Sequence, residues 1–182
     1  MNLPHETQNI CNSVKTSILY DQPFCHLYIN DFFSNKFYNN ILNFLPKKDQ
    51  YTQINKTKSV SNDYPEERYI FNITPETFKI FYPEQKLFFG QVVSSLMSKD
   101  FFDVIIKKFN GKIEKVNGNN LEIRMALVKD FTKYNLGAHT DAKKKYMTFL
   151  FYLPEDTSHK HIGTSLYKTK KNSNIKLLND NH

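Results

Sequence analysis

The chain has 182 residues, of which 40% are hydrophobic and 15% aromatic. This length and composition favour one domain with a core rich in Phe and Tyr, and they exclude disordered and fibrous classes. The net charge of +7 does not by itself indicate a nucleic-acid partner, because the lysines are scattered along the chain rather than concentrated in one arm. We therefore expect no nucleic-acid partner; a basic nucleic-acid-binding protein is kept as a third alternative, which predicts a contiguous positive face and steep salt dependence of binding.

The cysteines and the N-terminus indicate a cytoplasmic protein. Cys11 and Cys25 are not in a CxxC pair, so both are predicted to be free thiols. The N-terminal residues lack the basic, apolar and small-residue regions of a signal peptide, and no apolar run of about 18 residues is present. We expect no membrane partner.

The N-terminal third is predicted to contain one strand and one helix. Residues 1–22 are polar without a clear period and favour an irregular lead-in, while Phe24 to Phe32 favours a strand. Ser34 is a typical N-cap, and the helix after it has one apolar stripe: Phe37, Ile41, Leu42 and Leu45. Residues 47–68 favour a long loop of the kind that can overhang a site.

Helices are predicted between residues 74 and 110. Thr74, Pro75 and Glu76 are typical of a short helix start. Two further helices follow, with Asp100 as the expected cap of the second and Asn110-Gly111 as its end. Their apolar residues are interpreted as core rather than as a cofactor site: Leu87, Phe88, Val92, Leu96, Phe101, Ile105, Ile106 and Phe109.

The C-terminal part reads as a series of strands. Residues 121–128 alternate between apolar and other side chains, which predicts a strand with one buried face. Arg124 is interpreted as lying on its solvated face. The run from Tyr146 to Pro154 predicts a buried strand, and residues 164–168 and 174–178 predict two shorter ones.

Between these strands, His139 and Asp141 are spaced as metal ligands. Side chains at i and i+2 of an extended chain leave the same face, so both can converge on one ion. Imidazole and carboxylate, completed by a second histidine, make the 2-His-1-carboxylate arrangement that leaves open positions on Fe(II). Gly137 is expected to permit a tight approach before the pair. The alternative reading of the pair is a solvated surface turn.

At this point the sequence resembles the Fe(II)- and 2-oxoglutarate-dependent oxygenases of prolyl-hydroxylase type. The matching segments are YNLGAHTD, Lys145 with Thr148 after it, FLFYLPED and GTSLY, with a looser match in PFCHLYINDFFSNKFYNNILNFLP. The resemblance implies an α+β fold, in which helices flank a double-stranded β-helix (jelly-roll) core that begins near residue 121. It also implies that His139 and Asp141 lie side by side at one mouth of that core, in one domain spanning residues 1–182.

The resemblance further implies the cofactors Fe(II) and 2-oxoglutarate, oxygen as cosubstrate, ascorbate as a candidate reductant, and hydroxylation of an unactivated C–H bond. Tyr134 and Tyr152 are candidates to donate hydrogen bonds to a 2-oxoglutarate carboxylate, or else are packing aromatics. Lys145 occupies the position of a recurring lysine. A small molecule, a peptide and a glycan-linked compound all stay open as substrates.

The family's distal histidine and 2-oxoglutarate-binding Arg or Lys are not identifiable. The remaining candidates for the third ligand are each interpreted as solvated: His159, His161 and His182. The expectation is a domain incomplete at its C-terminal end, with late core strands missing, that binds Fe(II) poorly and does not turn over 2-oxoglutarate as given. The alternative from another class is a non-catalytic β-helix module that serves in binding or structure.

Overall fold

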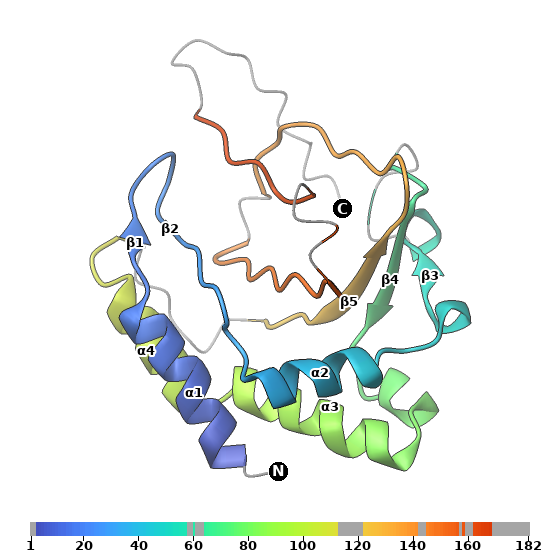
Figure 1. Ribbon diagram of the computed structural model, residues 1–182. Helices are drawn as coiled ribbons and strands as arrows, with labels where there is room; N and C mark the ends of the chain where they lie inside the picture. The colour runs from blue at the N-terminus through green and yellow to red at the C-terminus, as the bar shows by residue number, and fades with distance from the viewer. Residues whose placement is uncertain are drawn as a thin grey trace.

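Figure 1 shows the computed structural model of the protein. The structure describes residues 3–57, 60, 64–112, 122–141, 145–156, 158 and 162–168. Within these ranges helices combine with two small antiparallel sheets, one of two strands and one of three, so the expected mixture of helix and strand is confirmed. The sheets found there do not by themselves establish a jelly-roll core.

The chain begins with a helix, α1 (Leu3–Thr16), where an irregular lead-in was expected, so that prediction was wrong. α1 lies along α4 (Lys99–Lys108) in Figure 1. The Lys108 ammonium donates hydrogen bonds to the backbone carbonyls of Lys15, at 2.8 Å, and of Ser17. A cation at a helix C-terminus satisfies carbonyls that have no partner within the helix, so Lys108 fixes the end of α1 on α4.

Glu6 explains why the helical pattern of α1 was missed. The buried side chains of this helix are Glu6, Ile10, Cys11 and Val14, a helical spacing in which the first member is charged. Glu6 is only 4% exposed, and its two carboxylate oxygens accept hydrogen bonds from Ser34, one from the backbone N–H at 3.0 Å and one from the hydroxyl at 2.6 Å. The buried carboxylate thereby joins α1 to the start of the next helix.

That next helix, α2 (Asn35–Asn43), starts as predicted. Ser34 is its N-cap and accepts a hydrogen bond from the backbone N–H of Phe37. α2 lies beside α3 (Pro83–Leu96), where the Phe88 ring contacts the rings of Phe37 and Phe44 with centroids 5.1 and 5.2 Å apart. The amide of Gln85 on α3 donates to the Phe44 carbonyl at 3.0 Å, which satisfies the end of α2.

The two sheets are short. β1 (Leu19–Tyr20) pairs with β2 (His26–Leu27), so the strand predicted over 24–32 is reduced to two residues. The second sheet has the order β3-β4-β5, formed by β3 (Thr52–Gln53), β4 (Arg68–Asn72) and β5 (Ala126–Asp130). The predicted loop 47–68 also contains two single-turn 3₁₀ helices, Lys48–Gln50 and Ile54–Thr57.

A column of phenylalanines holds this sheet on the helices. Phe71 of β4 stacks on Phe81, and Phe81 stacks on Phe89 of α3, with centroids 5.2 and 5.1 Å apart. Since successive side chains of a strand point to opposite faces, Arg68 and Ile70 lie on the face of β4 turned away from this column. β4 and β5 therefore present one face to the helices and leave the other for the chain that follows β5.

Several predicted boundaries differ from the structure. Ser98, not Asp100, is the N-cap of α4, because its hydroxyl accepts a hydrogen bond from the Phe101 backbone N–H. The helix predicted from Thr74 is a 3₁₀ turn, Thr77–Ile80. The strand predicted over 121–128 starts at Ala126, where the ladder with β4 begins, while residues 122–125 are not in a strand.

The segment 145–156 is extended but is not part of a sheet. Its odd-numbered side chains pack on the helical layer: the Phe151 ring lies 5.0 Å from Phe32 and 5.4 Å from Phe33, and Phe149 lies 5.7 Å from Phe101. Tyr38 of α2 donates to the Pro154 carbonyl at 2.5 Å. No strand pairing among the described residues includes this segment or 162–168, so the predicted strands there lack a neighbour, and residues 174–178 lie outside the described ranges.

No helix within the described ranges is both long and apolar enough to cross a bilayer.

The clamp between Glu6 and Ser34 gives a test of this packing. Glu6→Gln replaces one of two acceptor oxygens by a donor and leaves a Ser34 donor unpaired. We expect a loss of about 1–3 kcal/mol in the free energy of unfolding, because a buried polar group without a partner costs that much. Urea denaturation measures it, with the exposed Glu66→Gln as control. Equal stability of the two variants would show that the clamp does not join α1 to α2.

Candidate metal centre

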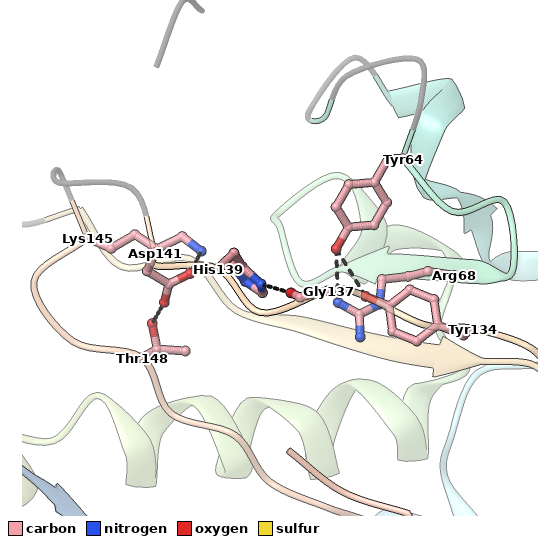
Figure 2. A network of polar contacts seen from close by, with 8 residues as sticks. All are labelled: Tyr64, Arg68, Tyr134, Gly137, His139, Asp141, Lys145 and Thr148. Atoms are coloured by element: carbon pink, nitrogen blue, oxygen red, sulfur yellow. Dashed lines mark hydrogen bonds and ion pairs between the residues drawn. The ribbon is translucent and has the colours of Figure 1, made fainter. Parts of the chain in front are cut away.

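The chain turns sharply between β5 and the predicted ligands. The Phe131 backbone N–H donates to the Glu67 carbonyl and the Tyr134 N–H donates to the Phe131 carbonyl, both at 3.0 Å. Lys133 within this turn has a positive φ of 79°, a conformation that few non-glycine residues adopt. After the turn, Tyr134 lies against Arg68 of β4, and Figure 2 shows Tyr134, Gly137, His139 and Asp141 of the segment that follows.

His139 is held in one tautomer by the backbone. Its Nδ1 lies 2.8 Å from the Gly137 carbonyl oxygen. A carbonyl oxygen only accepts, so Nδ1 carries the hydrogen and Nε2 of the neutral ring keeps its lone pair. Metal-binding histidines in proteins typically have this arrangement, in which one ring nitrogen is fixed by a carbonyl and the other is left for the metal.

Asp141 is oriented by two donors from the chain that follows it. Lys145 Nζ donates to Oδ1 and Thr148 Oγ1 donates to Oδ2, each at 2.7 Å. Burial by itself would raise the pKa of Asp141, but these two hydrogen bonds and the positive charge of Lys145 hold the pKa below its ordinary value. The carboxylate thus stays ionised, and each of its oxygens keeps a lone pair for a further partner.

The structure places His139 and Asp141 side by side, as Figure 2 shows. The described residues contain no group of three or more His, Cys, Asp and Glu side chains that could hold a metal ion. The candidates His159, His161 and His182 lie outside those residues. The described part of the chain therefore brings an imidazole and a carboxylate together, without a third side chain of these types beside them.

The role expected for Gly137 is not supported. A Cβ added at this position would meet no atom within 4 Å, so no close approach requires glycine there. What the residue provides is its carbonyl, which any amino acid also has.

Tyr134 belongs to a polar network that joins the turn to β4. Its hydroxyl lies 3.2 Å from the hydroxyl of Tyr64, and its ring centroid lies 4.1 Å from the guanidinium carbon of Arg68. Arg68 forms a double hydrogen bond to the Asp130 carboxylate, with both distances 2.7 Å. Burial and the bond with Tyr64 raise the pKa of Tyr134, so its hydroxyl keeps its proton at neutral pH.

The structure does not bring Tyr152 into this group. It is 53% exposed, and its hydroxyl shares a hydrogen bond with that of Thr164. Arg124 forms an exposed ion pair with Glu122, which agrees with its assignment to a solvated face.

Arg68, Asp130 and Tyr64 were not predicted as site residues. Arg68 and Asp130 are 62 positions apart, and Tyr64 and Tyr134 are 70 apart. The one sequence signal was the long loop that includes Tyr64 and ends at Arg68, which was expected to overhang a site.

Comparison with known proteins finds no similar protein for this chain: no family model, no curated protein and no solved structure matches it.

The depressed pKa of Asp141 predicts how this residue titrates. Stabilisation by Lys145 and Thr148 is present above the ordinary carboxyl pKa of about 4 and is lost as the pH falls through the lower folded value. In Lys145→Met with Thr148→Val the pKa of Asp141 should rise, because burial then acts with less opposition. Carbon-detected NMR of the carboxyl groups measures this, with Asp141→Asn to assign the signal.

The matched control for that titration is Lys168→Met, which removes an exposed lysine elsewhere. An unchanged Asp141 titration in the double variant would mean that the two contacts do not form in solution.

Proposed function

We propose that the protein is an Fe(II)- and 2-oxoglutarate-dependent dioxygenase that hydroxylates its substrate, with His139 and Asp141 as two of the iron ligands. The observation that carries the proposal is the orientation of this pair. The histidine has Nε2 free because Gly137 fixes Nδ1, and the neighbouring carboxylate is kept ionised by Lys145 and Thr148. Both side chains are exposed, and His26 makes the same contact with the Phe24 carbonyl, so it is the combination of the two oriented groups that supports the proposal.

The donor set fits the metal. One imidazole nitrogen and one carboxylate suit a borderline divalent ion, and a second histidine would complete the facial arrangement used by non-haem iron oxygenases. Iron bound with 2-oxoglutarate and oxygen supplies the oxidising power to hydroxylate a C–H bond. No second histidine is grouped with this pair among the described residues.

The chain's own residues have distinct roles in this proposal. His139 and Asp141 hold the metal, while Lys145 and Thr148 keep the carboxylate in position. Tyr134 lies on the same side of the sheet, and its protonated hydroxyl suits a carboxylate oxygen of 2-oxoglutarate. Tyr152 has no such role in the proposal, because its exposed hydroxyl is bonded to Thr164.

The proposed fold is the double-stranded β-helix. Two features support it: Arg68 on the open face of β4 contacts Tyr134, which begins the segment with the candidate ligands, and Phe149 and Phe151 pack as same-face residues of a strand do. In such a core the segment 145–156 would gain strand neighbours. The substrate stays open among small molecules, peptides and glycan-linked compounds, because variable loops select it.

Metal affinity tests the proposal directly. Mn(II) is a suitable probe because it resists oxidation in air. We expect His139→Ala and Asp141→Asn each to weaken Mn(II) binding at least tenfold, since loss of even an outer partner of a metal site typically costs about 10–100-fold. Calorimetry measures the affinity, with the exposed His5→Ala as the control. Equal affinities of the two ligand variants and the wild type would contradict the assignment.

Succinate release in the presence of Fe(II), 2-oxoglutarate and ascorbate tests the reaction itself. Production that requires both His139 and Asp141 would support a dioxygenase. Absence of succinate is the outcome expected of a chain without its second histidine, so Mn(II) binding that neither His139→Ala nor Asp141→Asn weakens is the result that would favour the alternative, a non-catalytic binding or structural module.

The third ligand is open to the same measurement. Because His159, His161 and His182 are each interpreted as solvated, we expect alanine at any one of them to leave Mn(II) affinity unchanged, and free imidazole to strengthen binding by supplying a nitrogen. A loss as large as that in His139→Ala would instead identify that histidine as the missing ligand.

A further inference from the structure

The segment 145–156 exposes apolar side chains on both of its faces. Phe149 and Phe151 point to the helical layer with nearly parallel rings, yet they stay 40% and 37% exposed. Leu150 and Tyr152 lie on the opposite face, because side chains of an extended chain alternate, and they are 61% and 53% exposed. A continuous apolar surface of this kind typically marks a place where another polypeptide binds.

The backbone of this segment is also available for pairing. Among the described residues, no sheet ladder and no backbone hydrogen bond joins residues 147–153 to another strand. Residues 146–153 contain no charged residue, glycine or proline, and most of them are aromatic or β-branched, a composition that favours strand pairing. The N–H and C=O groups of an exposed extended chain are a template for a further strand. The segment therefore fits a β-strand of another polypeptide.

The order of residues in the segment selects a second copy of the same chain as that polypeptide. In an antiparallel pair centred on Leu150, Phe149 of one copy lies opposite Phe151 of the other. In the same register Lys145 lies opposite Glu155, an attractive pair of charges. Both pairs form twice, because the two strands exchange roles. The segment is thus complementary to itself in apolar side chains and in charge.

The charged pair fixes one register. The Lys145 side chain is 53% exposed, and Glu155 is exposed as well. The Lys145 ammonium donates one hydrogen to Asp141 and keeps two for a second carboxylate. A shift of two residues keeps the same faces together but places Lys145 opposite Leu153 or Thr157, so only the register centred on residue 150 matches the charges.

We infer that the segment 145–156 is the interface of a homodimer, in which it pairs antiparallel with the same segment of a second copy about a two-fold axis at Leu150. Both copies use the same edge of the segment, so the contact is closed and gives a dimer rather than a filament. The second copy supplies the strand neighbour that the proposed β-helix requires here. Thr148, which holds Asp141, then lies opposite Tyr152 of the second copy, so dimer formation fixes one support of the candidate metal centre.

Sedimentation equilibrium of the full chain measures the dimer. Leu150→Lys places two ammonium groups opposite each other at the axis and removes the central apolar contact, so we expect the dissociation constant of the dimer to rise about tenfold. The matched control is Leu87→Lys on α3, where the leucine is 69% exposed, and it should dimerise as the wild type does. A wild type that stays monomeric, or a Leu150→Lys variant with an unchanged dissociation constant, would overturn the interface.

Exchange of charges tests the register without removing an apolar contact. Lys145→Glu sets carboxylates against each other in both charged pairs, and Glu155→Lys does the same with ammonium groups, so each variant alone should dimerise more weakly. A mixture of the two variants restores both attractive pairs and should form the heterodimer in preference to either homodimer. An affinity tag on one variant measures how much of the other it retains. Random mixing would overturn the register.

Cysteine cross-linking locates the axis. Residues opposite each other in antiparallel strands have Cα atoms about 4.5–5.5 Å apart, within the range that a disulfide requires. Under oxidised glutathione, Leu150→Cys should therefore form an intermolecular disulfide in the dimer, whereas the control Leu87→Cys should not. Equal cross-linking of the two variants would contradict a two-fold axis at Leu150.

Mn(II) binding distinguishes this inference from the proposed function, because the interface contains neither His139 nor Asp141. A dimer that does not bind Mn(II) would keep the interface and contradict the metal centre. A monomer whose Mn(II) binding needs His139 would do the reverse.

Discussion

The antiparallel pairing of β4 with β5 is the interaction on which the rest of the structure depends. It places Phe71 opposite Leu127 and Arg68 opposite Asp130, in one register. Because strand side chains alternate between faces, this register sends the first pair to the helical layer and the second pair to the open side. A slip of one residue would exchange the two faces, burying the charges and exposing the phenylalanine.

The candidate metal centre is local in sequence, whereas its surroundings are not. Gly137, His139, Asp141, Lys145 and Thr148 contact one another within a short stretch, so a single loop orients both ligands. Tyr134 at the start of that loop is held by Arg68 and Tyr64 from β4 and the segment before it. The β4-β5 sheet thus connects the candidate pair of ligands to a tyrosine that is held by residues distant in sequence.

In the segment 145–156, side-chain packing and strand pairing act separately: the first decides where the segment lies, and the second decides whether it is a strand. Phe149 and Phe151 are anchored on aromatic rings of the helical layer, and Tyr38 donates to the Pro154 carbonyl. These contacts place the segment without a particular neighbour along its backbone, although Phe149 and Phe151 stay 40% and 37% exposed. A strand requires in addition a second backbone in register, and the described residues provide none for this segment.

The sequence by itself determined the features that depend on near neighbours. The spacing of His139 and Asp141, the Ser34 cap and the helices over 83–108 follow from period and capping, which act within a few residues. Tertiary structure decided the rest. α1 was hidden because its buried stripe contains Glu6, whose charge is tolerated only where Ser34 donates to it. The β4-β5 ladder sets Arg68 opposite Asp130, and the Tyr134 ring lies over its guanidinium. Arg68 could not be predicted as a neighbour of the site, because no local sequence pattern encodes a partner 62 positions away.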